Sequence, residues 1–420
     1  MLIEIINTGA ELMLGRVLNT HQQWLCRQLA GLGYEVARQT CVADDARQIQ
    51  AAVRESLSRA DLVLTTGGLG PTSDDLTRDL IARLLGRNLS LDPETLARVE
   101  QYFRQRHRVM PASSRVQAMV PAGARLLPND HGTAPGLLME ARPNPFRPDG
   151  LPSWLILLPG PPRELRPMFA QSVIPFLSRE LPPAEKFVCL ILKTTGLGES
   201  LVEEKIAGPL RELVQAGLDL GYCARVGEVE VRLAARGNGA ESMVGQAESV
   251  VRRLLGRLIY AVGDESLESV LVRMLAERGK TVALAESCTG GMVANRLTNV
   301  PGASAVLKCG LVTYSNEAKR EFLGVSAAAL EEHGAVSEVV ARLMAEGARQ
   351  RCRADYAISI TGIAGPSGGS QAKPVGTVFM ALADEKGTVV QRQFNPFDRE
   401  TFKYVTSQQS LDMLRLALLG

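Results

Sequence analysis

The sequence lacks the features that mark disulfide-rich, zinc-binding and membrane-spanning chains. Its seven cysteines are scattered, odd in number and form no Cys-x-x-Cys pair, and its four histidines stand apart. They predict neither a disulfide framework nor a zinc cluster, and they fit a reducing cytosol. The longest apolar runs, such as Trp154–Leu158, are too short for a bilayer, and no signal-like segment precedes Leu2–Ile6. We therefore expect a cytoplasmic protein with no membrane partner.

Excess charge of one sign is also absent. The chain has 47 Lys and Arg against 45 Asp and Glu, a formal net charge of +2. A surface for duplex DNA or an anionic membrane usually carries a strong basic excess, so the sequence offers no footprint for either. Its 420 residues, 45% of them hydrophobic, suit two or three globular domains.

The first 175 residues alternate short β-branched runs with helical patterns. We expect strands at Ile3–Ile6, Asp61–Thr65 and Trp154–Leu158, and helices at Asn19–Leu32 and from about Asp74. Such alternation predicts a parallel, three-layer α/β sheet.

The chain changes character around Leu181-Pro182-Pro183. Residues 187–260 read as a small α+β unit: strands at 187–192, 228–233 and 258–262, and helical segments at 200–218 and 241–255. No Gly-x-x-Gly loop with basic flanks occurs there, so nucleic-acid binding is not supported.

A second α/β domain follows. Ser266 is the expected N-cap of a helix over Leu267–Arg278, and strands are expected at Thr281–Ala285 and Asp355–Ile360. The predicted fold class is α/β, with two three-layer α/β domains joined by a small α+β domain. The predicted boundaries are 1–180, 181–262 and 263–420.

Ser287 stands where a predicted strand gives way to a helix, followed by Thr289-Gly290-Gly291. The helix N-terminus would offer N–H groups to an anion, either a phosphate or the oxyanion of acyl transfer. A serine nucleophile needs a base, and Lys319 can serve only if its pKa is lowered. Serine is also a common N-cap, so the residues alone leave both interpretations open. For Cys288 a buried, inert thiol is the default.

A second glycine-rich turn follows the strand at Asp61–Thr65. Gly67, Gly68 and Gly70 precede Thr72 and the pair Asp74-Asp75. Glycine amides can cradle a phosphate, and two carboxylates can hold a divalent ion that bridges a pyrophosphate. A tight turn with Asp74 as a helix N-cap explains the same residues, so this motif also stays open.

Six segments in fixed order carry a resemblance that bears on both sites. They are AESCTGG (285–291), GLVTYSNEAK (310–319), LGV (323–325), HGAVSE (333–338), TGIAGPSGG (361–369) and KPVGTV (373–378). Together they resemble the C-terminal domain of the CinA family of competence/damage-inducible proteins, a nicotinamide-nucleotide amidase. The N-terminal loops are similar to the same family's molybdopterin-binding-like domain, so the resemblance covers essentially the whole chain. It also implies that the middle unit is of KH type.

For the C-terminal domain the resemblance implies hydrolysis of nicotinamide mononucleotide to nicotinate mononucleotide and ammonia, with no metal. Ser287 would be the nucleophile and Lys319 its base. Tyr314 and Thr361 would orient Lys319 or the substrate, and Arg399 would hold the substrate phosphate. The glycines expected at the substrate are Gly290, Gly291 and Gly362.

For the N-terminal domain the resemblance implies an ADP-ribose pyrophosphatase that yields AMP and ribose 5-phosphate. It would need a divalent metal (Co, Mg or Mn) and be stimulated by potassium. Two residues depart from the family pattern: Ser114 stands where asparagine is common, and Ala10 replaces an acidic residue. The residues expected at the phosphates are Gly67, Gly68, Gly70, Thr72 and Asn19. Those expected at the metal are Asp75, Glu11 and Glu164.

The sequence therefore favours a bifunctional hydrolase of pyridine-nucleotide salvage, and the family suggests a homodimer. Two other functions fit parts of the chain. A non-catalytic, competence-associated nucleotide-binding protein is consistent with Ser287 acting only as a cap. A molybdopterin-handling protein fits the first domain alone, but the amidase motifs argue against it.

Overall fold

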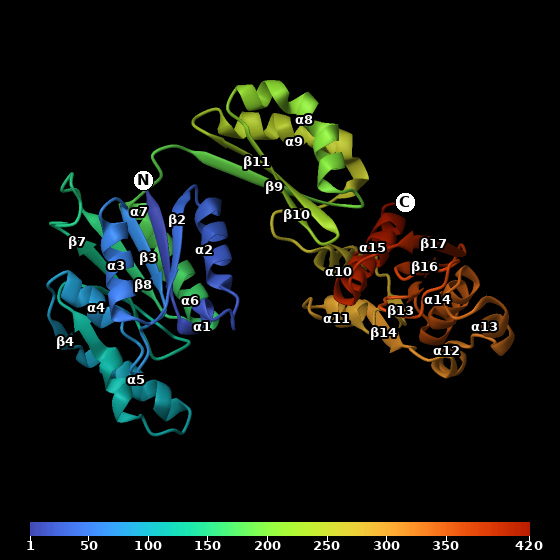
Figure 1. The fold of residues 1–420 in the computed structure, drawn as a ribbon, viewed down its shortest axis with the longest axis horizontal. Coiled ribbons are helices and arrows are strands. Elements are labelled where there is room, and N and C mark those ends of the chain that lie inside the picture. The colour runs from blue at the N-terminus through green and yellow to red at the C-terminus, as the bar shows by residue number, and fades with distance from the viewer. The chain divides into compact units, whose positions relative to one another are not determined.

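The computed structural model describes all residues, Met1–Gly420, and the chain divides into two compact units. One comprises Met1–Cys189 with Arg236–Ala240, and the other comprises Leu190–Ala235 with Glu241–Gly420. Each has a large sheet covered by helices (Figure 1). A smaller four-stranded sheet, most of which belongs to the second unit, comes between the two large sheets in the sequence. None of the helices combines the length and apolar character that a membrane span requires.

The N-terminal unit is built on a six-stranded sheet in the order β2-β1-β3-β8-β7-β6. The first four of these strands are parallel, but β7 and β6 are antiparallel to their neighbours. The predicted parallel pairing is therefore present in these four strands, and one edge of the sheet is antiparallel. The loop over residues 142–152 joins β7 to β8 and is too short for the crossover that a parallel pair needs. The strands are β1 Ile3–Thr8, β2 Val36–Val42, β3 Leu62–Thr66, β6 Arg125–Leu127, β7 Gly136–Ala141 and β8 Ser153–Leu158, with β4 Leu89–Leu91 and β5 Met119–Pro121 forming a separate pair.

Helices cover both faces of this sheet because side chains alternate along its strands. Ile3 and Ile5 of β1 face α2, α6 and α7, whereas Ile6 faces α3 and α4. The helices and turns are α1 Ala10–Met13, α2 Thr20–Gly31, α3 Ala46–Leu57, α4 Thr77–Leu84, α5 Pro93–Gln105, η1 Ala112–Ala118, α6 Pro162–Met168, η2 Phe169–Val173 and α7 Ile174–Glu180.

Helix α4 begins at Thr77, three residues after the predicted start at Asp74. The N–H of Thr72 donates to Asp75 Oδ2 (2.9 Å) and closes a turn that delays the helix. Leu76 is the N-cap and its side chain makes no capping hydrogen bond, so the alternative interpretation in which Asp74 caps this helix is wrong.

The middle segment is an α+β unit with the sheet order β10-β11-β9-β12. The sequence analysis missed β10, an edge strand that pairs antiparallel with β11 and has no fully buried residue to reveal a periodic pattern. The elements are β9 Phe187–Thr195, α8 Glu199–Gln215, β10 Asp219–Arg225, β11 Glu228–Arg236, α9 Ala240–Leu255, η3 Gly256–Leu258 and β12 Ile259–Val262.

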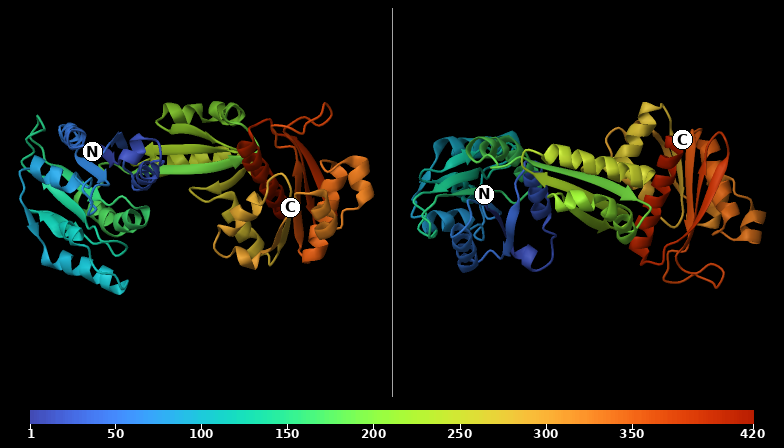
Figure 2. Two further views of the ribbon diagram at one scale, coloured as in Figure 1. Left: turned by 60° about the horizontal axis from the view of Figure 1, so that its bottom comes forward. Right: turned by 90° about the horizontal axis from the view of Figure 1, so that it is seen from above.

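The C-terminal sheet has the order β14-β13-β15-β16-β17, in which β13 is parallel to both neighbours and β16 and β17 are antiparallel. One face packs on α10, α11 and α15, and the other on α12, α13 and α14 (Figure 2). Ser266 caps α10 as predicted, accepting from Ser269 N–H. The elements are α10 Leu267–Glu277, β13 Val282–Glu286, α11 Met292–Thr298, η4 Ala303–Ala305, β14 Leu307–Val312, α12 Asn316–Leu323, α13 Ala327–His333, α14 Glu338–Cys352, β15 Tyr356–Gly362, β16 Thr377–Ala383, β17 Thr388–Phe394 and α15 Arg399–Leu419.

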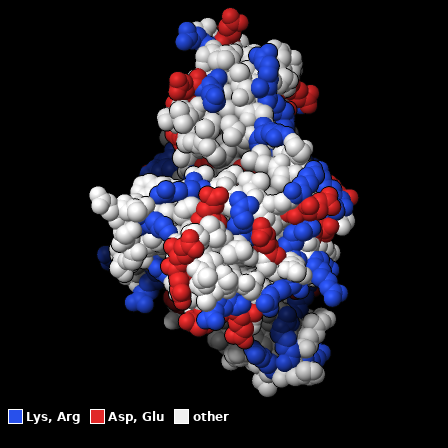
Figure 3. Space-filling view, turned by 90° about the vertical axis from the view of Figure 1, so that its right-hand side faces the viewer, with Lys and Arg blue, Asp and Glu red and all other residues white.

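Surface charge is mixed. On the face that Figure 3 shows, Lys and Arg side chains are interspersed with Asp and Glu. This distribution agrees with the small formal net charge of +2.

Candidate active sites

Ser287 lies directly after β13, an inner strand of the C-terminal sheet. Its N–H donates to the carbonyl of Ile360 in β15 (3.0 Å), which fixes the residue between two parallel strands. The N-cap of α11 is Gly291, with φ +91°, so Ser287 is not a helix cap. The interpretation of Ser287 as a helix N-cap is therefore wrong, and its hydroxyl does not cap α11.

The N-terminus of α11 is already occupied by a carboxylate. Both oxygens of Glu286, which is 1% exposed, accept backbone N–H groups from Gly291 (3.0 Å), Val293 (3.1 Å) and Ala294 (2.8 Å). The expectation that these amides face an incoming anion is wrong, because an internal anion takes them. The sequence analysis missed this residue.

Lys319 comes to Ser287 from α12, on which it is 1% exposed. Its Nζ lies 3.2 Å from Ser287 Oγ, 2.9 Å from Thr313 O and 3.3 Å from Tyr314 O. Burial lowers the pKa of Lys319 from its ordinary value, more than the neighbouring Cys288 and the Glu317 carboxylate raise it. A neutral amine has two N–H donors and one lone pair. It can therefore donate to the two carbonyls and accept the Ser287 hydroxyl proton.

Cys288, the neighbouring thiol, is buried in the apolar core of the domain. Burial raises the pKa of Cys288 to about 12, so the thiol stays protonated near neutral pH. Thiolate, not thiol, is the nucleophile. Ser287 is therefore the better-placed nucleophile of this adjacent pair.

Tyr314 and Arg399 meet at the exposed rim of the same site. Tyr314 is 60% exposed, and its hydroxyl accepts from an Arg399 Nη2–H (2.8 Å) while Nη1–H donates to the carbonyl of Gly365 (2.8 Å). Only the backbone carbonyl of Tyr314 touches Lys319. An arginine anchored in this way keeps a fixed, exposed guanidinium, which suits an anionic group of a ligand.

The remaining residues predicted for this site shape the backbone around it. Thr361 is buried, and its hydroxyl donates to the carbonyl of Ala335 (2.7 Å) rather than contacting Lys319. A Cβ at Gly362 would lie 2.9 Å from the carbonyl oxygen of Thr377. Gly290 has φ +62°, in the left-handed region. A Cβ at this position would have Lys403 Nζ as its nearest neighbour, at 3.7 Å. These positions shape the turn around Ser287 and the end of β15.

In the N-terminal unit, the glycine loop after β3 lines a cavity of about 370 Å³. A Cβ at Gly68 would collide with Thr77 Oγ1, and one at Gly70 would collide with Asp75 Oδ2. Any side chain at either glycine would therefore displace a neighbour. The predicted residues that line this cavity are Gly67, Gly68, Gly70, Thr72, Asp75, Glu11 and Glu164.

Asn19 and Glu164 have partners of their own. Asn19 does not line the cavity but is the N-cap of α2, accepting from Gln22 N–H (3.1 Å). Glu164 is 7% exposed and accepts from Asn129 Nδ2 (2.8 Å). A Cβ at Gly132 would collide with this carboxylate, so Glu164 supports the 129–134 segment.

Asp44 is a cavity residue that the sequence analysis missed. It follows β2, and its carboxylate accepts from Ala10 N–H (2.8 Å). Burial raises the pKa of Asp44, and so do the negative charges of Glu11, Asp74 and Asp75. No three His, Cys, Asp or Glu side chains form a group that could hold a metal ion as they stand. The carboxylates that line this cavity are oxygen donors, the kind of ligand that Mg²⁺ prefers.

Known proteins match the chain along its whole length. Residues 4–179 match the probable molybdopterin binding domain, 191–261 the damage-inducible protein CinA KH domain and 264–418 the CinA C-terminal domain. A competence-damage inducible protein of Symbiobacterium thermophilum is 46% identical, covering 100% of this chain and 99% of its own. A CinA-like protein of Akkermansia muciniphila is 44% identical, covering 97% and 95%.

Solved structures match single domains of this chain. A competence/damage inducible protein of Agrobacterium tumefaciens is 41% identical and covers 37% of this chain and 98% of its own, with a TM-score of 0.35. The three family domains that match the sequence and the full-length relatives confirm the resemblance that the six ordered segments carry. This chain belongs to the CinA family.

Proposed function

We propose that the C-terminal domain is a nicotinamide-nucleotide amidase that converts nicotinamide mononucleotide to nicotinate mononucleotide and ammonia. The observation that carries this proposal is the 3.2 Å approach of Lys319 Nζ to Ser287 Oγ, with Lys319 buried and its other partners uncharged. A buried lysine that contacts a serine hydroxyl can take its proton as the general base, and the serine can then act as the nucleophile.

The proposed reaction has two steps: an ester forms on Ser287 with release of ammonia, and water then hydrolyses this ester. Ser287 Oγ attacks the carboxamide carbon, its proton passes to Lys319 Nζ, and the negative charge develops on the amide oxygen. The C–N bond then breaks, Lys319 returns the proton to the leaving nitrogen, and ammonia departs from an ester on Ser287. In the second step water attacks this ester, and Lys319 takes the water proton. The proton returns to Ser287 Oγ as the carboxylic acid product leaves and ionises.

Ammonia release from nicotinamide mononucleotide tests the amidase. We expect Ser287→Ala to lose activity by at least about 10³-fold, because nucleophile and base act as a unit. Cys288→Ala is the matched control, since it removes the adjacent buried thiol, and it should keep most activity. Unchanged release by Ser287→Ala would reject the serine mechanism. No release by the wild-type chain would favour a non-catalytic nucleotide-binding protein.

We further propose that the N-terminal domain hydrolyses ADP-ribose to AMP and ribose 5-phosphate. The supporting observation is one cavity lined both by the glycine loop and by the carboxylates of Asp44, Asp75 and Glu11. Loop amides can bind phosphate oxygens, and these carboxylates would hold the metal. When bound, the divalent ion supplies charge neutralisation of the pyrophosphate.

Turnover of ADP-ribose with and without added Mg²⁺, Mn²⁺ or Co²⁺ tests this second activity. We expect Asp75→Ala to lose metal-dependent turnover while ammonia release in the other domain is retained. Loss of both activities would show a folding defect or coupling between the sites. Turnover that is unaffected by chelation would contradict the metal-dependent mechanism, and absent turnover would leave a molybdopterin-handling role as the better account.

A further inference from the structure

Arg296 is a buried cation of the C-terminal domain that the amidase chemistry does not use. It lies in the last turn of α11 and is 8% exposed. Its Nη1 donates to Ser407 Oγ (2.9 Å), and its Nη2 donates to Gln408 Oε1 (2.6 Å) and Glu268 Oε2 (2.8 Å). The guanidinium also lies over the ring of Tyr404, 5.0 Å from its centre. These five residues, which we call the Arg296 network, fix α11 to α10 and to α15.

The two helices α11 and α15 carry different parts of the proposed active site. Helix α11 follows the turn of Ser287, and α15 begins with Arg399, the residue expected at the substrate phosphate. One turn further along α15, Lys403 Nζ would lie 3.7 Å from a Cβ at Gly290, so α15 packs beside the turn that presents the nucleophile. The spacing between the nucleophile and the phosphate-binding group therefore depends on how α15 packs on α11.

The middle α+β unit contacts the Arg296 network through one turn. Val226 and Gly227 join β10 to β11, and a Cβ at Gly227 would lie 3.1 Å from Gln408 Cγ. The carbonyl of Gly227 accepts from Thr195 Oγ1 (2.9 Å), which ties the turn to β9. Gly227 has φ +78°, a conformation that residues with a Cβ rarely adopt. The turn therefore supports α15 at a residue that binds Arg296.

A second contact fixes the same hairpin to the C-terminal core. The Tyr260 hydroxyl donates to the carboxylate of Glu228, the first residue of β11. Tyr260 lies in β12 and packs in the hydrophobic core that the sheet forms with α10, α11 and α15. Because Glu228 directly follows Gly227, this hydrogen bond limits how far the turn can move from α15.

Stability alone does not explain a buried arginine at this place. Replacing a buried ion pair by apolar residues of similar volume is often neutral or stabilising, because removing the charges from water offsets their attraction. Gln408 is 1% exposed, and its Nε2 has no hydrogen-bond partner, which is a further cost. The network instead supplies direction. A planar guanidinium binds its partners only at fixed angles, so it fixes the position of α15 on α11.

We propose that Arg296 is a positioning residue of the amidase and that the β10–β11 turn of the middle unit holds it in place. The network sets the spacing between Ser287 and Arg399, so that a substrate bound through its phosphate presents its carboxamide to the serine hydroxyl. Arg296 acts through these two residues and does not touch the substrate. This inference rests on the proposed amidase and adds that its active site depends on the middle unit.

Steady-state ammonia release from nicotinamide mononucleotide by the full-length chain tests the role of Arg296. We expect Arg296→Met, which keeps apolar bulk, to lower kcat by about 10- to 100-fold and to leave KM within about twofold. The reason is that the phosphate still binds while the carboxamide is misplaced. A lower Tm with unchanged kcat would show a merely structural role for Arg296 and would overturn the proposal.

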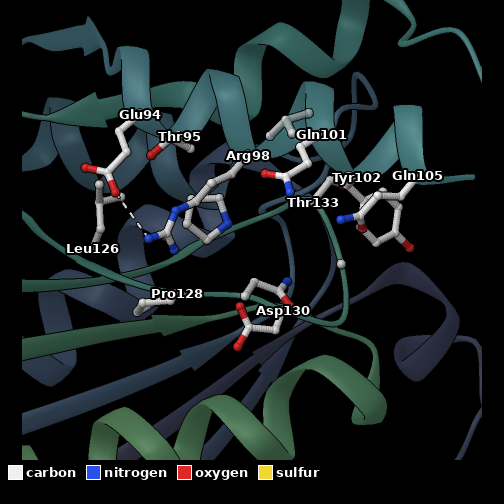
Figure 4. Close-up of a pocket in the computed structure, with 14 residues that line it drawn as sticks. Glu94, Thr95, Arg98, Gln101, Tyr102, Gln105, Leu126, Pro128, Asp130 and Thr133 are labelled. Atoms are coloured by element: carbon white, nitrogen blue, oxygen red, sulfur yellow. Dashed lines mark hydrogen bonds and ion pairs between the residues drawn. The ribbon is translucent and has the colours of Figure 1, made fainter.

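Arg98→Met is the matched control for the loss of an arginine–glutamate pair. Arg98 donates to Glu94 (3.1 Å, Figure 4), but it lies at an exposed position on α5 in the N-terminal unit. This variant should change neither kcat nor KM for ammonia release.

The contribution of the middle unit is tested at Gly227. Gly227→Leu forces a side chain against Gln408 without emptying the core, so it tests the link even if Arg296→Met does not fold. We expect it to lower kcat by about 3- to 10-fold. Gly237→Leu is its control and should keep the wild-type kcat, since Gly237 has a similar φ of +85° but a Cβ there would have no neighbour within 4 Å.

The double variant shows whether the turn acts through Arg296. Gly227→Leu should lower kcat little further when it is added to Arg296→Met, because both changes disturb one contact. Additive effects, or equal effects of Gly227→Leu and Gly237→Leu, would overturn the link to the middle unit. A wild-type chain that releases no ammonia would instead reject the amidase itself, so the two failures are distinguishable.

Discussion

Lys319 Nζ lies 3.2 Å from Ser287 Oγ, and the two other oxygens that contact this amine are the backbone carbonyls of Thr313 and Tyr314. Burial destabilises the protonated form of the Lys319 amine. The two carbonyl dipoles offset this cost less than a carboxylate would. The same carbonyls use both N–H donors of the neutral amine and so direct its lone pair at the hydroxyl. Once Lys319 is neutral, its lone pair can therefore accept the hydroxyl proton of Ser287.

Removing the base should be nearly as damaging as removing the nucleophile. We expect Lys319→Met, which keeps length and apolar bulk, to reduce kcat for ammonia release by about 10³-fold or more with little change in KM. Lys319→Arg should fail similarly, because a guanidinium does not deprotonate in proteins. Steady-state kinetics check both variants, and substantial activity in Lys319→Arg would exclude a proton-accepting role.

The pH dependence follows from the lowered pKa of Lys319. Lys319 must be neutral to accept a proton, so kcat/KM should rise with pH and level off below about 10.4, the pKa of an ordinary lysine. Between the lowered pKa and that value the unfolded chain binds more protons, so stability also rises with pH there. Urea unfolding of wild type and Lys319→Met across this range checks the second point, since the variant should lose that contribution to the slope.

Much of this arrangement could be predicted from sequence, and the exceptions have physical reasons. Buried strands such as β1, β8 and β13 show as short apolar runs, and the ordered motifs indicate Ser287 and Lys319. The role of Glu286 could not be predicted, because a carboxylate reaches amides five to eight residues later only through the tight turn between them. Asp44 lies in no glycine-rich motif. Its position after β2, which is parallel to β1, is the signal that could have found it.

Glu286 should be essential to the geometry of the nucleophile. Glu286→Gln places an NH₂ group among backbone N–H donors, so at least one of three hydrogen bonds is lost. We expect a cost of about 1–3 kcal/mol in stability and a lower kcat. The urea concentration at which amidase activity disappears measures this change. Glu321→Gln, a change at an exposed carboxylate on α12, is the control and should shift that concentration little.

A divalent cation should stabilise the N-terminal unit through Asp44. The charges of Glu11, Asp74 and Asp75 raise the Asp44 pKa, and a bound cation would relieve this repulsion. We expect Mn²⁺ or Mg²⁺ to raise the Tm of the wild-type chain and to raise it less in Asp44→Asn. Glu100→Gln, which lies outside the cavity, should respond as wild type does. An equal rise in all three chains would place the cation elsewhere.

The contact between Arg399 and Tyr314 predicts how the proposed amidase would bind the phosphate of nicotinamide mononucleotide. Arg399 Nη2–H donates to the Tyr314 hydroxyl (2.8 Å), so Tyr314→Phe frees the guanidinium without removing its charge. We expect Arg399→Ala to raise KM for nicotinamide mononucleotide by about 10-fold or more, and Tyr314→Phe to raise it less. Because the tyrosine would act through the arginine, the double variant should show little more than the Arg399→Ala effect. Fully additive effects would show that Tyr314 contacts the substrate independently. An unchanged KM in Arg399→Ala would move the phosphate site away from this rim.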